Sequence, residues 1–165
     1  MALKEHQKSN RNAWQTFAED YVEPAEIGWR SNDPKWGIWQ IPESQLGLLP
    51  IDLTGKKCIE IGCGAGYVSS WMARRGGAAI GIDPTPNQLE TARRLEKEHG
   101  LGVEFIEAFG EELPFPDSTF DFGNIGSPSN TGPTSLRPGI SLKVTTDITP
   151  SLFFTSLKSI FFILA

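Results

Sequence analysis

Residues 58–66 read Cys-Ile-Glu-Ile-Gly-Cys-Gly-Ala-Gly, so a short apolar segment runs directly into three alternating glycines. The apolar residues predict a strand over 57–61, and the glycines that follow predict a tight turn. Glycines at such a turn also leave room for a ligand against the main-chain N–H groups at the start of a helix. The stretch therefore predicts a strand, a ligand-binding loop and a helix in succession.

The segments that follow alternate between helix and strand. We expect a helix over 65–75, a strand over 78–83, a helix over 86–99, and strands over 103–107 and 120–122. Thr85, Pro86 and Gln88 have the spacing of a capping box with proline in the first helical position, and Gly100 ends that helix. This alternation is typical of right-handed βαβ crossovers, so it predicts an α/β fold with a parallel sheet.

Two flanking segments differ from this core, which we place at residues 51–122. Residues 1–50 are rich in tryptophan and predict an aromatic N-terminal cap, with Trp14, Phe17 and Tyr21 on one face of its first helix. Residues 123–165 carry few charges and many serines and threonines, and their glycines and prolines exclude a stable helix before Leu136. We expect this tail to close the sheet irregularly or to leave it incomplete.

Composition excludes several classes of function. The chain has 165 residues and a formal net charge of −5, which provides no broad cationic surface for nucleic acid. The two cysteines, Cys58 and Cys63, form neither a disulfide framework nor a metal-binding pattern, which favours a cytoplasmic protein without a metal. The N-terminus lacks an apolar signal core, and the apolar segment 152–165 is interrupted by Lys158, so neither export nor membrane insertion is expected.

The acidic residues beside the glycine loop indicate the charge of its ligand. Glu60 precedes the loop, and a carboxylate there disfavours a pyrophosphate and favours a cation. Asp83 ends the next strand, where it can accept both hydroxyls of a ribose. The glycine spacing is G-x-G-x-G, with Tyr67 where a dinucleotide-binding loop has its third glycine. Together these features predict a nucleoside that bears positive charge.

At these residues the sequence resembles the class I methyltransferases that use S-adenosylmethionine. The resemblance covers about residues 55–122 and rests on Glu60-Ile-Gly-Cys-Gly-Ala-Gly66, on Gly81-Ile-Asp-Pro84, and on Gly110-Glu-Glu-Leu-Pro-Phe115 followed by Phe120-Asp121. It implies a Rossmann-like three-layer αβα sheet that is incomplete on its C-terminal side. It also implies S-adenosylmethionine as the cofactor.

The resemblance assigns a role to each candidate site residue. The loop of Gly62, Cys63, Gly64, Ala65 and Gly66 would pass under the methionine part of the cofactor, Glu60 would help to fix that part, and Asp83 would hold the ribose. Pro84, Phe109, Gly110 and Glu111 would border the adenine. Phe109 departs from the family pattern, in which many members place an aspartate that accepts a hydrogen bond from the adenine amine.

The expected function is methyl transfer to an unidentified small-molecule acceptor. Transfer from a sulfonium can proceed through positioning and desolvation, and the sequence identifies no catalytic base, since His6 and His99 have ordinary surface roles. Cys63 is interpreted as a small loop residue and not as a reactive thiol. Two alternatives stay open, a non-catalytic cofactor-binding fragment or interaction module and an NAD-dependent oxidoreductase.

Overall fold

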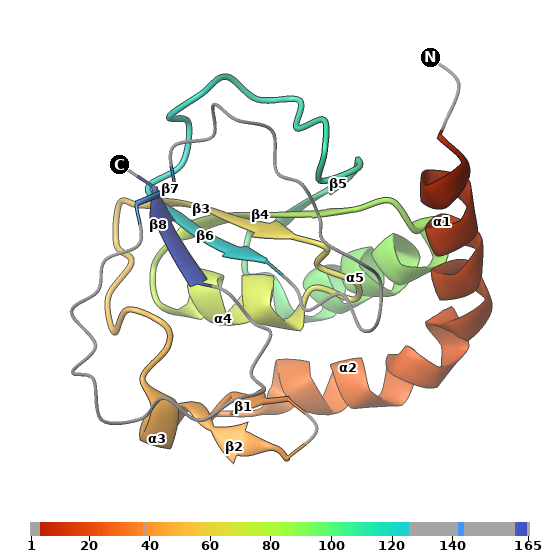
Figure 1. The fold of residues 1–165 in the computed structure, drawn as a ribbon. Coiled ribbons are helices and arrows are strands. Elements are labelled where there is room, and N and C mark those ends of the chain that lie inside the picture. The colour runs from red at the N-terminus through yellow and green to blue at the C-terminus, as the bar shows by residue number, and fades with distance from the viewer. Residues whose placement is uncertain (1–3, 38, 126–141, 144–160, 165) are drawn as a thin grey trace.

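The computed structural model describes residues 4–37, 39–125, 142–143 and 161–164 (Figure 1). The helices are α1 (Glu5–Phe17), the 3-10 helix η1 (Ala18–Tyr21), α2 (Val22–Arg30), α3 (Glu43–Leu46), α4 (Tyr67–Arg74) and α5 (Pro86–His99). The strands are β1 (Lys35–Trp36), β2 (Ile41–Pro42), β3 (Lys57–Ile61), β4 (Ala78–Asp83), β5 (Glu104–Glu107), β6 (Phe122–Ile125), β7 (Leu142–Lys143) and β8 (Phe161–Leu164). Strands β1 and β2 form a small antiparallel pair apart from the main sheet.

The main sheet has the strand order β5-β4-β3-β6-β8-β7. The first four strands are parallel to one another, which confirms the predicted α/β fold and its crossovers. Strand β8 pairs antiparallel with β6 and with β7. Strands β7 and β8 come from the tail, so this segment adds an antiparallel edge to the parallel sheet. The rest of the tail, 126–141, 144–160 and 165, lies outside the described residues.

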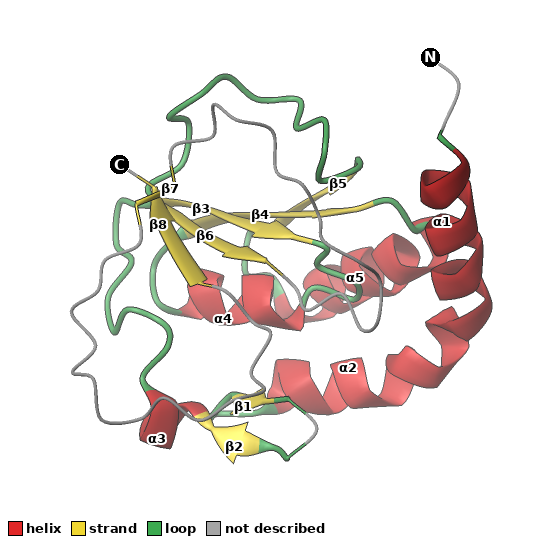
Figure 2. Cartoon of the chain, viewed as in Figure 1, coloured by secondary structure: helices red, strands yellow, loops and turns green. Residues whose placement is uncertain are grey.

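Helices α4 and α5 cover one face of the sheet, as Figure 2 shows. Side chains that alternate along the strands point to this face, since successive residues of a strand face opposite sides. Cys58 of β3, Ala79 of β4 and Phe105 of β5 share a buried cluster with Met72 of α4 and Leu89 of α5. The apolar stripe predicted for the second helix, Leu89, Ala92 and Leu95, is buried, and this burial holds α5 on the sheet.

The opposite face is covered differently in the described part of the chain. Ile59 and Ile82 point there and form a second apolar cluster with Phe120. The 108–121 link supplies the cover, with Leu113 and Phe115 packed against this cluster (Figure 2). Among the described residues this face therefore carries a loop and no helix.

Most predicted boundaries agree with the structure. The strands over 57–61 and 78–83 are confirmed, as are Pro86 in the first turn of α5 and Gly100 as its left-handed C-cap at φ 65°. The capping box is wrong, because Thr85 makes no side-chain cap bond and its N–H donates to Asp83 instead. The fourth core strand spans Phe122–Ile125, two residues later than the start we expected.

The N-terminal segment packs tightly on the core through α2. Trp29 is fully buried, and its Nε1–H donates to the carbonyl of Ala65 at 2.9 Å. Trp71 of α4 donates to the carbonyl of Gly28 at 3.3 Å, and the rings of Trp36 and Trp71 meet edge to face. The aromatic face predicted for the first helix is only partly formed. The ring centroids of Trp14 and Tyr21 are 5.7 Å apart, whereas Phe17 is 52% exposed.

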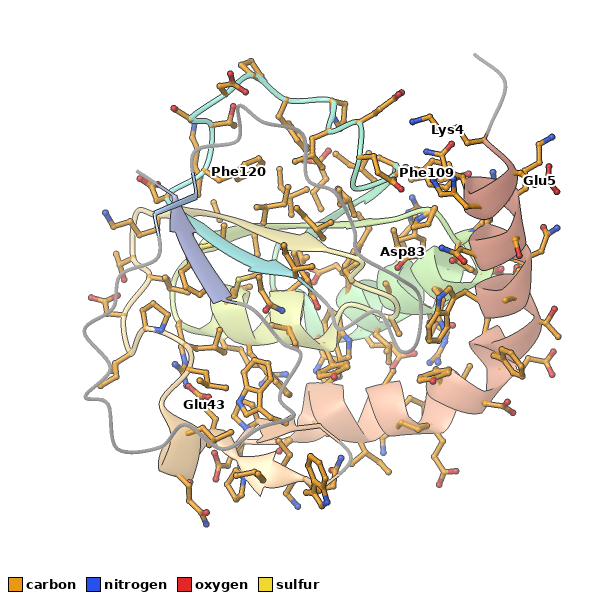
Figure 3. All side chains as sticks on the ribbon, viewed as in Figure 1. Lys4, Glu5, Glu43, Asp83, Phe109 and Phe120 are labelled. Carbon is orange, nitrogen blue, oxygen red and sulfur yellow. The ribbon has the colours of Figure 1, made fainter. Side chains whose placement is uncertain are left out.

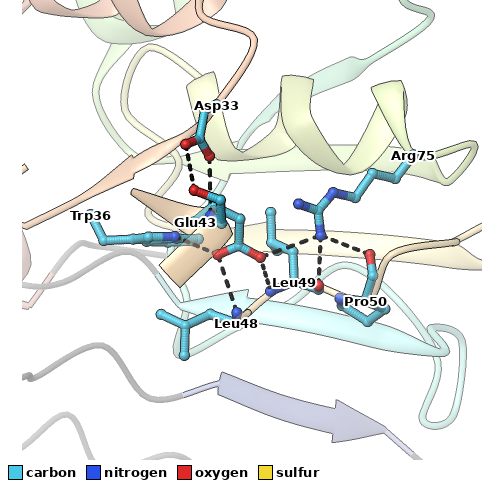
Figure 4. Close-up of polar contacts among 8 residues, drawn as sticks. Asp33, Trp36, Glu43, Leu48, Leu49, Pro50 and Arg75 are labelled. Atoms are coloured by element: carbon cyan, nitrogen blue, oxygen red, sulfur yellow. Dashed lines mark hydrogen bonds and ion pairs between the residues drawn. The ribbon is translucent and has the colours of Figure 1, made fainter. Parts of the chain in front are cut away.

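A buried carboxylate anchors the chain between the N-terminal segment and the sheet (Figure 4). Glu43 is 3% exposed and accepts hydrogen bonds from Trp36 Nε1, Leu48 N and Leu49 N at 2.7, 3.1 and 2.7 Å. Arg75 pairs with it at 3.3 Å. Arg75 also donates to two carbonyls of the 49–50 turn. The network fixes the path of the chain into β3, and nothing in the local sequence predicts it.

The structure also bears on membrane insertion. In the described residues, no helix combines the length and the apolar character that a transmembrane span requires.

Candidate functional site

The glycine loop after β3 is a tight turn tied to the neighbouring strand. Gly62, Gly64 and Gly66 have φ values of 71°, 52° and 75°, a left-handed conformation that favours glycine. The N–H groups of Gly62 and Cys63 both donate to the carbonyl of Ile82, at 2.8 and 2.9 Å. The predicted helix over 65–75 starts later, at Tyr67, because Gly66 is its left-handed N-cap.

Asp83 joins the end of β4 to this loop. Its Oδ2 accepts the N–H of Gly64 at 2.9 Å, and its Oδ1 accepts the N–H of Thr85 at 2.8 Å. Burial raises the pKa of Asp83 above its ordinary value, although both N–H donors oppose the shift. Each carboxylate oxygen can accept more than one hydrogen bond, so Asp83 keeps the capacity to accept hydroxyl groups.

Glu60 lies on the α4 side of the sheet and is 2% exposed. One of its oxygens, Oε2, accepts both the N–H of Ser69 at 2.7 Å and the hydroxyl of Ser69 at 2.5 Å. Burial raises the pKa of Glu60 to about 8, against the lowering effect of these bonds. The sequence argument took Glu60 as ionised. The structure corrects this, because a carboxyl buried without a cation favours its neutral form at pH 7.

We expect this burial to give the chain a pH-dependent stability that the Glu60→Gln variant lacks. The pKa of Glu60 is about 8 when folded and ordinarily 4.5, so the folded chain retains a proton that the unfolded chain releases. The stabilisation is therefore complete below the ordinary pKa and is lost as the pH rises through the folded pKa. Relative to the variant, the parent chain should lose about 1.4 kcal/mol of unfolding free energy per pH unit within this window.

Urea unfolding of both chains at several pH values between about 5.5 and about 7.5 measures the difference. The matched control is Glu104→Gln, because Glu104 is exposed on β5. Its difference from the parent should stay constant with pH. Parallel curves for Glu60→Gln and the parent would contradict the assignment of a buried, protonated Glu60.

The segment after β5 comes to the same edge of the sheet. Figure 3 shows Phe109 and Asp83 near one another at this end, beside α1. The N–H of Ala108 donates to the carbonyl of Asp83 at 3.2 Å. A Cβ added to Gly110 would lie 2.7 Å from Ile61, so Gly110 packs against the end of β3. The structure thus brings together the ends of β3 and β4 and the segment predicted to border the adenine.

The remaining predicted residues have clear positions. Pro84 is partly buried directly after Asp83, and Glu111 lies 3.6 Å from His6 of α1. The Cys63 side chain is 3% exposed, and burial raises the pKa of its thiol, so it is a small neutral loop residue as interpreted. The ring of His99 packs against the ring of Trp29, with their centroids 5.4 Å apart. Among the described residues, no cluster of His, Cys, Asp or Glu is placed to hold a metal ion.

Sequence reasoning missed three residues that contact the glycine loop or Glu60 and support their positions. Trp29 reaches the loop from a position 36 residues earlier in the chain, and Ser69 supplies both donors to Glu60. The ring of Phe105 would lie 2.4 Å from a Cβ at Gly66, so it restricts that position to glycine. The tryptophans in the otherwise polar N-terminal segment were a sequence signal that could have identified Trp29 as a packing residue. No such local signal marks Ser69 or Phe105.

Comparison with known proteins agrees with this geometry. Residues 58–127 match a family described as a methyltransferase domain. A methyltransferase from Aquifex aeolicus, described as SAM dependent, shares the fold, with a TM-score of 0.50 and 19% identity over 67% of this chain and 55% of its own. The core of this chain is thus similar to a methyltransferase domain in sequence and to a methyltransferase in fold. The match begins at Cys58 and includes every site residue predicted above.

Two curated relatives of this chain are ubiquinone biosynthesis O-methyltransferases. The protein from Actinobacillus pleuropneumoniae is 45% identical over 61 residues, which are 37% of this chain and 26% of that protein. The protein from Histophilus somni is 34% identical over 98 residues, which are 58% of this chain and 41% of that protein. The chain thus matches less than half the length of either relative.

Proposed function

We propose that this chain transfers a methyl group from S-adenosylmethionine to a small-molecule acceptor. The observation that carries the proposal is the contact between Asp83 and Gly64, which joins a glycine loop to an acidic strand end. S-adenosylmethionine supplies an activated methyl group on a sulfonium, whose departure leaves a neutral thioether. The protein therefore has to bind, orient and desolvate, and it needs no nucleophile of its own.

The residues at the sheet edge fit such a ligand. Asp83 offers carboxylate oxygens to paired hydroxyls, as a ribose requires. Glu60, buried beside the loop, gains its charge most easily when a cation is close, since an opposite charge lowers the pKa of a carboxyl. Phe109, partly buried after β5, offers a ring on which a flat base can stack. Each group thus complements one part of the cofactor.

The acceptor is proposed to be a small molecule. The net charge of −5 disfavours a nucleic-acid acceptor, because binding to phosphates depends on cationic residues. The names of the two relatives support an oxygen as the methylated atom. This chain matches less than half the length of either relative, so the similarity is limited support for a particular acceptor.

Replacing Asp83 tests the cofactor assignment. We expect Asp83→Ala to weaken the binding of S-adenosylmethionine by roughly 1–3 kcal/mol, because ribose hydroxyls would lose a charged acceptor. Asp83→Asn retains one acceptor oxygen and should lose less. Calorimetric titration of the parent chain and both variants gives the affinities, with the exposed Asp117→Ala as the matched control.

The same titration separates the competing functions. Unchanged affinity in Asp83→Ala would rule out the ribose assignment. Saturable binding of NAD, in place of S-adenosylmethionine, would favour an oxidoreductase. Binding of S-adenosylmethionine without methyl transfer to any compound in a panel of phenols, amines and thiols would favour a non-catalytic cofactor-binding module.

A further inference from the structure

Asn124 is a buried polar residue that no function above explains. It is the penultimate residue of β6 and is 2% exposed. Its side-chain oxygen Oδ1 has no hydrogen-bond partner among the residues that the structure describes. A buried acceptor without a donor costs about 1–3 kcal/mol, and native proteins hold few of them. Among the described residues, Asn124 therefore carries an acceptor that is not satisfied.

The sheet register places Asn124 beside Glu60. The two residues are direct partners in the parallel pairing of β3 with β6. In-register residues on neighbouring strands project from the same face, and their strands lie about 4.8 Å apart. Glu60 projects toward α4, where it accepts hydrogen bonds from Ser69, so Asn124 projects to this face as well. The buried carboxyl of Glu60 and the buried amide of Asn124 thus lie side by side, one residue before the carboxyl ends of their strands.

The strand order indicates which part of a ligand would reach Asn124. This step rests on the proposed function. From the sheet edge, the strands are β5, β4, β3 and β6. The segment after β5 borders the base, Asp83 at the end of β4 receives the ribose, and the loop after β3 receives the amino-acid part. The next strand, β6, adjoins the amino-acid part, which carries a carboxylate that only accepts hydrogen bonds and an ammonium that only donates them.

We propose that Asn124 Oδ1 accepts a hydrogen bond from the ammonium group of the cofactor's methionine part, so that Asn124 is a binding residue of this site. The assignment gives a donor to the unpaired oxygen and places the ammonium beside the carboxyl of Glu60. It also explains why a polar residue occupies a strand position that an apolar side chain would fill at lower cost.

The test compares two ligands that differ in the amino-acid part. S-adenosylhomocysteine carries the ammonium, whereas 5′-methylthioadenosine has the same nucleoside and thioether without it. We expect Asn124→Leu to weaken binding of S-adenosylhomocysteine roughly tenfold, the effect of losing a hydrogen bond to a charged group, and to leave the affinity for 5′-methylthioadenosine unchanged. The thermal unfolding midpoint of the ligand-free variant should equal or exceed that of the parent, because leucine removes the unpaired oxygen.

The control is Asn12→Leu, an exposed position on α1, where both affinities should stay unchanged. Both affinities are measured on the same variant, and their ratio is then compared with that of the parent chain. Asn124→Ala therefore provides the same comparison if Asn124→Leu does not fold. Equal weakening of both ligands, together with a lower unfolding midpoint, would mean that Asn124 only supports the fold and would overturn the proposal. An unchanged ratio would overturn it as well. If the parent chain binds neither ligand, the proposed function fails first.

Discussion

Replacing Glu43 by alanine is expected to lower the free energy of unfolding by about 3–5 kcal/mol, the cost of removing one partner from a buried, hydrogen-bonded ion pair. The carboxylate is 3% exposed and accepts four hydrogen bonds, from the indole of Trp36, from two backbone N–H groups and from Arg75 (Figure 4). Without it, these donors lose the carboxylate that accepts their bonds, and Arg75 loses its ion-pair partner. Urea unfolding followed by tryptophan fluorescence measures the loss.

Three further variants separate the loss of the hydrogen-bond acceptor from the loss of the ion pair and from a general effect of removing a glutamate. Glu43→Gln retains one acceptor oxygen and should lose roughly half as much. Combining Glu43→Ala with Arg75→Ala should cost less than the sum of the two single losses, because the second change removes a charge that is already unpaired. The exposed Glu104→Ala should change stability by less than about 0.5 kcal/mol. A loss below about 1 kcal/mol for Glu43→Ala would show that water replaces the carboxylate.

Replacing Gly66 by alanine is expected to cost about 3–5 kcal/mol, because backbone strain and steric overlap act at the same position. The residue has φ 75°, and a Cβ there would lie 2.4 Å from Cε1 and 2.5 Å from Cζ of Phe105. The added methyl group can fit only if the ring of Phe105 or the loop moves. Since the loop carries the Asp83–Gly64 contact, binding of S-adenosylmethionine should weaken together with stability.

Gly64→Ala is the matched control for this prediction. Gly64 also has a positive φ, of 52°, but the nearest atom to its added Cβ is the end of the Gln88 side chain at 3.7 Å. This variant carries the backbone strain without the overlap, and we expect it to cost about 1 kcal/mol. Combining Gly66→Ala with Phe105→Leu should recover part of the loss. Equal losses for Gly64→Ala and Gly66→Ala would contradict the role given to Phe105.

The sequence could predict the elements that are encoded by near neighbours. The strands over 57–61 and 78–83, the proline at the start of α5 and the glycine at its end depend on residue types a few positions apart. The parallel sheet followed from their alternation. The glycine loop and Asp83 were predicted to share a sheet edge because consecutive parallel strands end at the same side, and the Gly64–Asp83 bond agrees with this.

The tertiary structure alone decided the electrostatic state of the site. Glu60 is an ordinary acid in the sequence, and only the packing of α4 over β3 buries it and raises its pKa to about 8. The failed capping box has a similar cause. Gln88 has the right spacing to reach the N–H of Thr85, but Asp83 at the end of a different element already accepts that group. Local spacing shows which bonds are possible, and competition in the folded chain selects among them.

What the sequence determined by itself was the order of elements and the loop at their centre, because periodicity and turn chemistry act over a few residues. What only the tertiary structure decided was the set of contacts between distant segments. Trp29 reaches Ala65 across 36 residues, and Arg75 reaches Glu43 across 32. The position of Asn124 beside Glu60 likewise follows from strand pairing. Such contacts depend on how whole elements pack, and no local pattern encodes them.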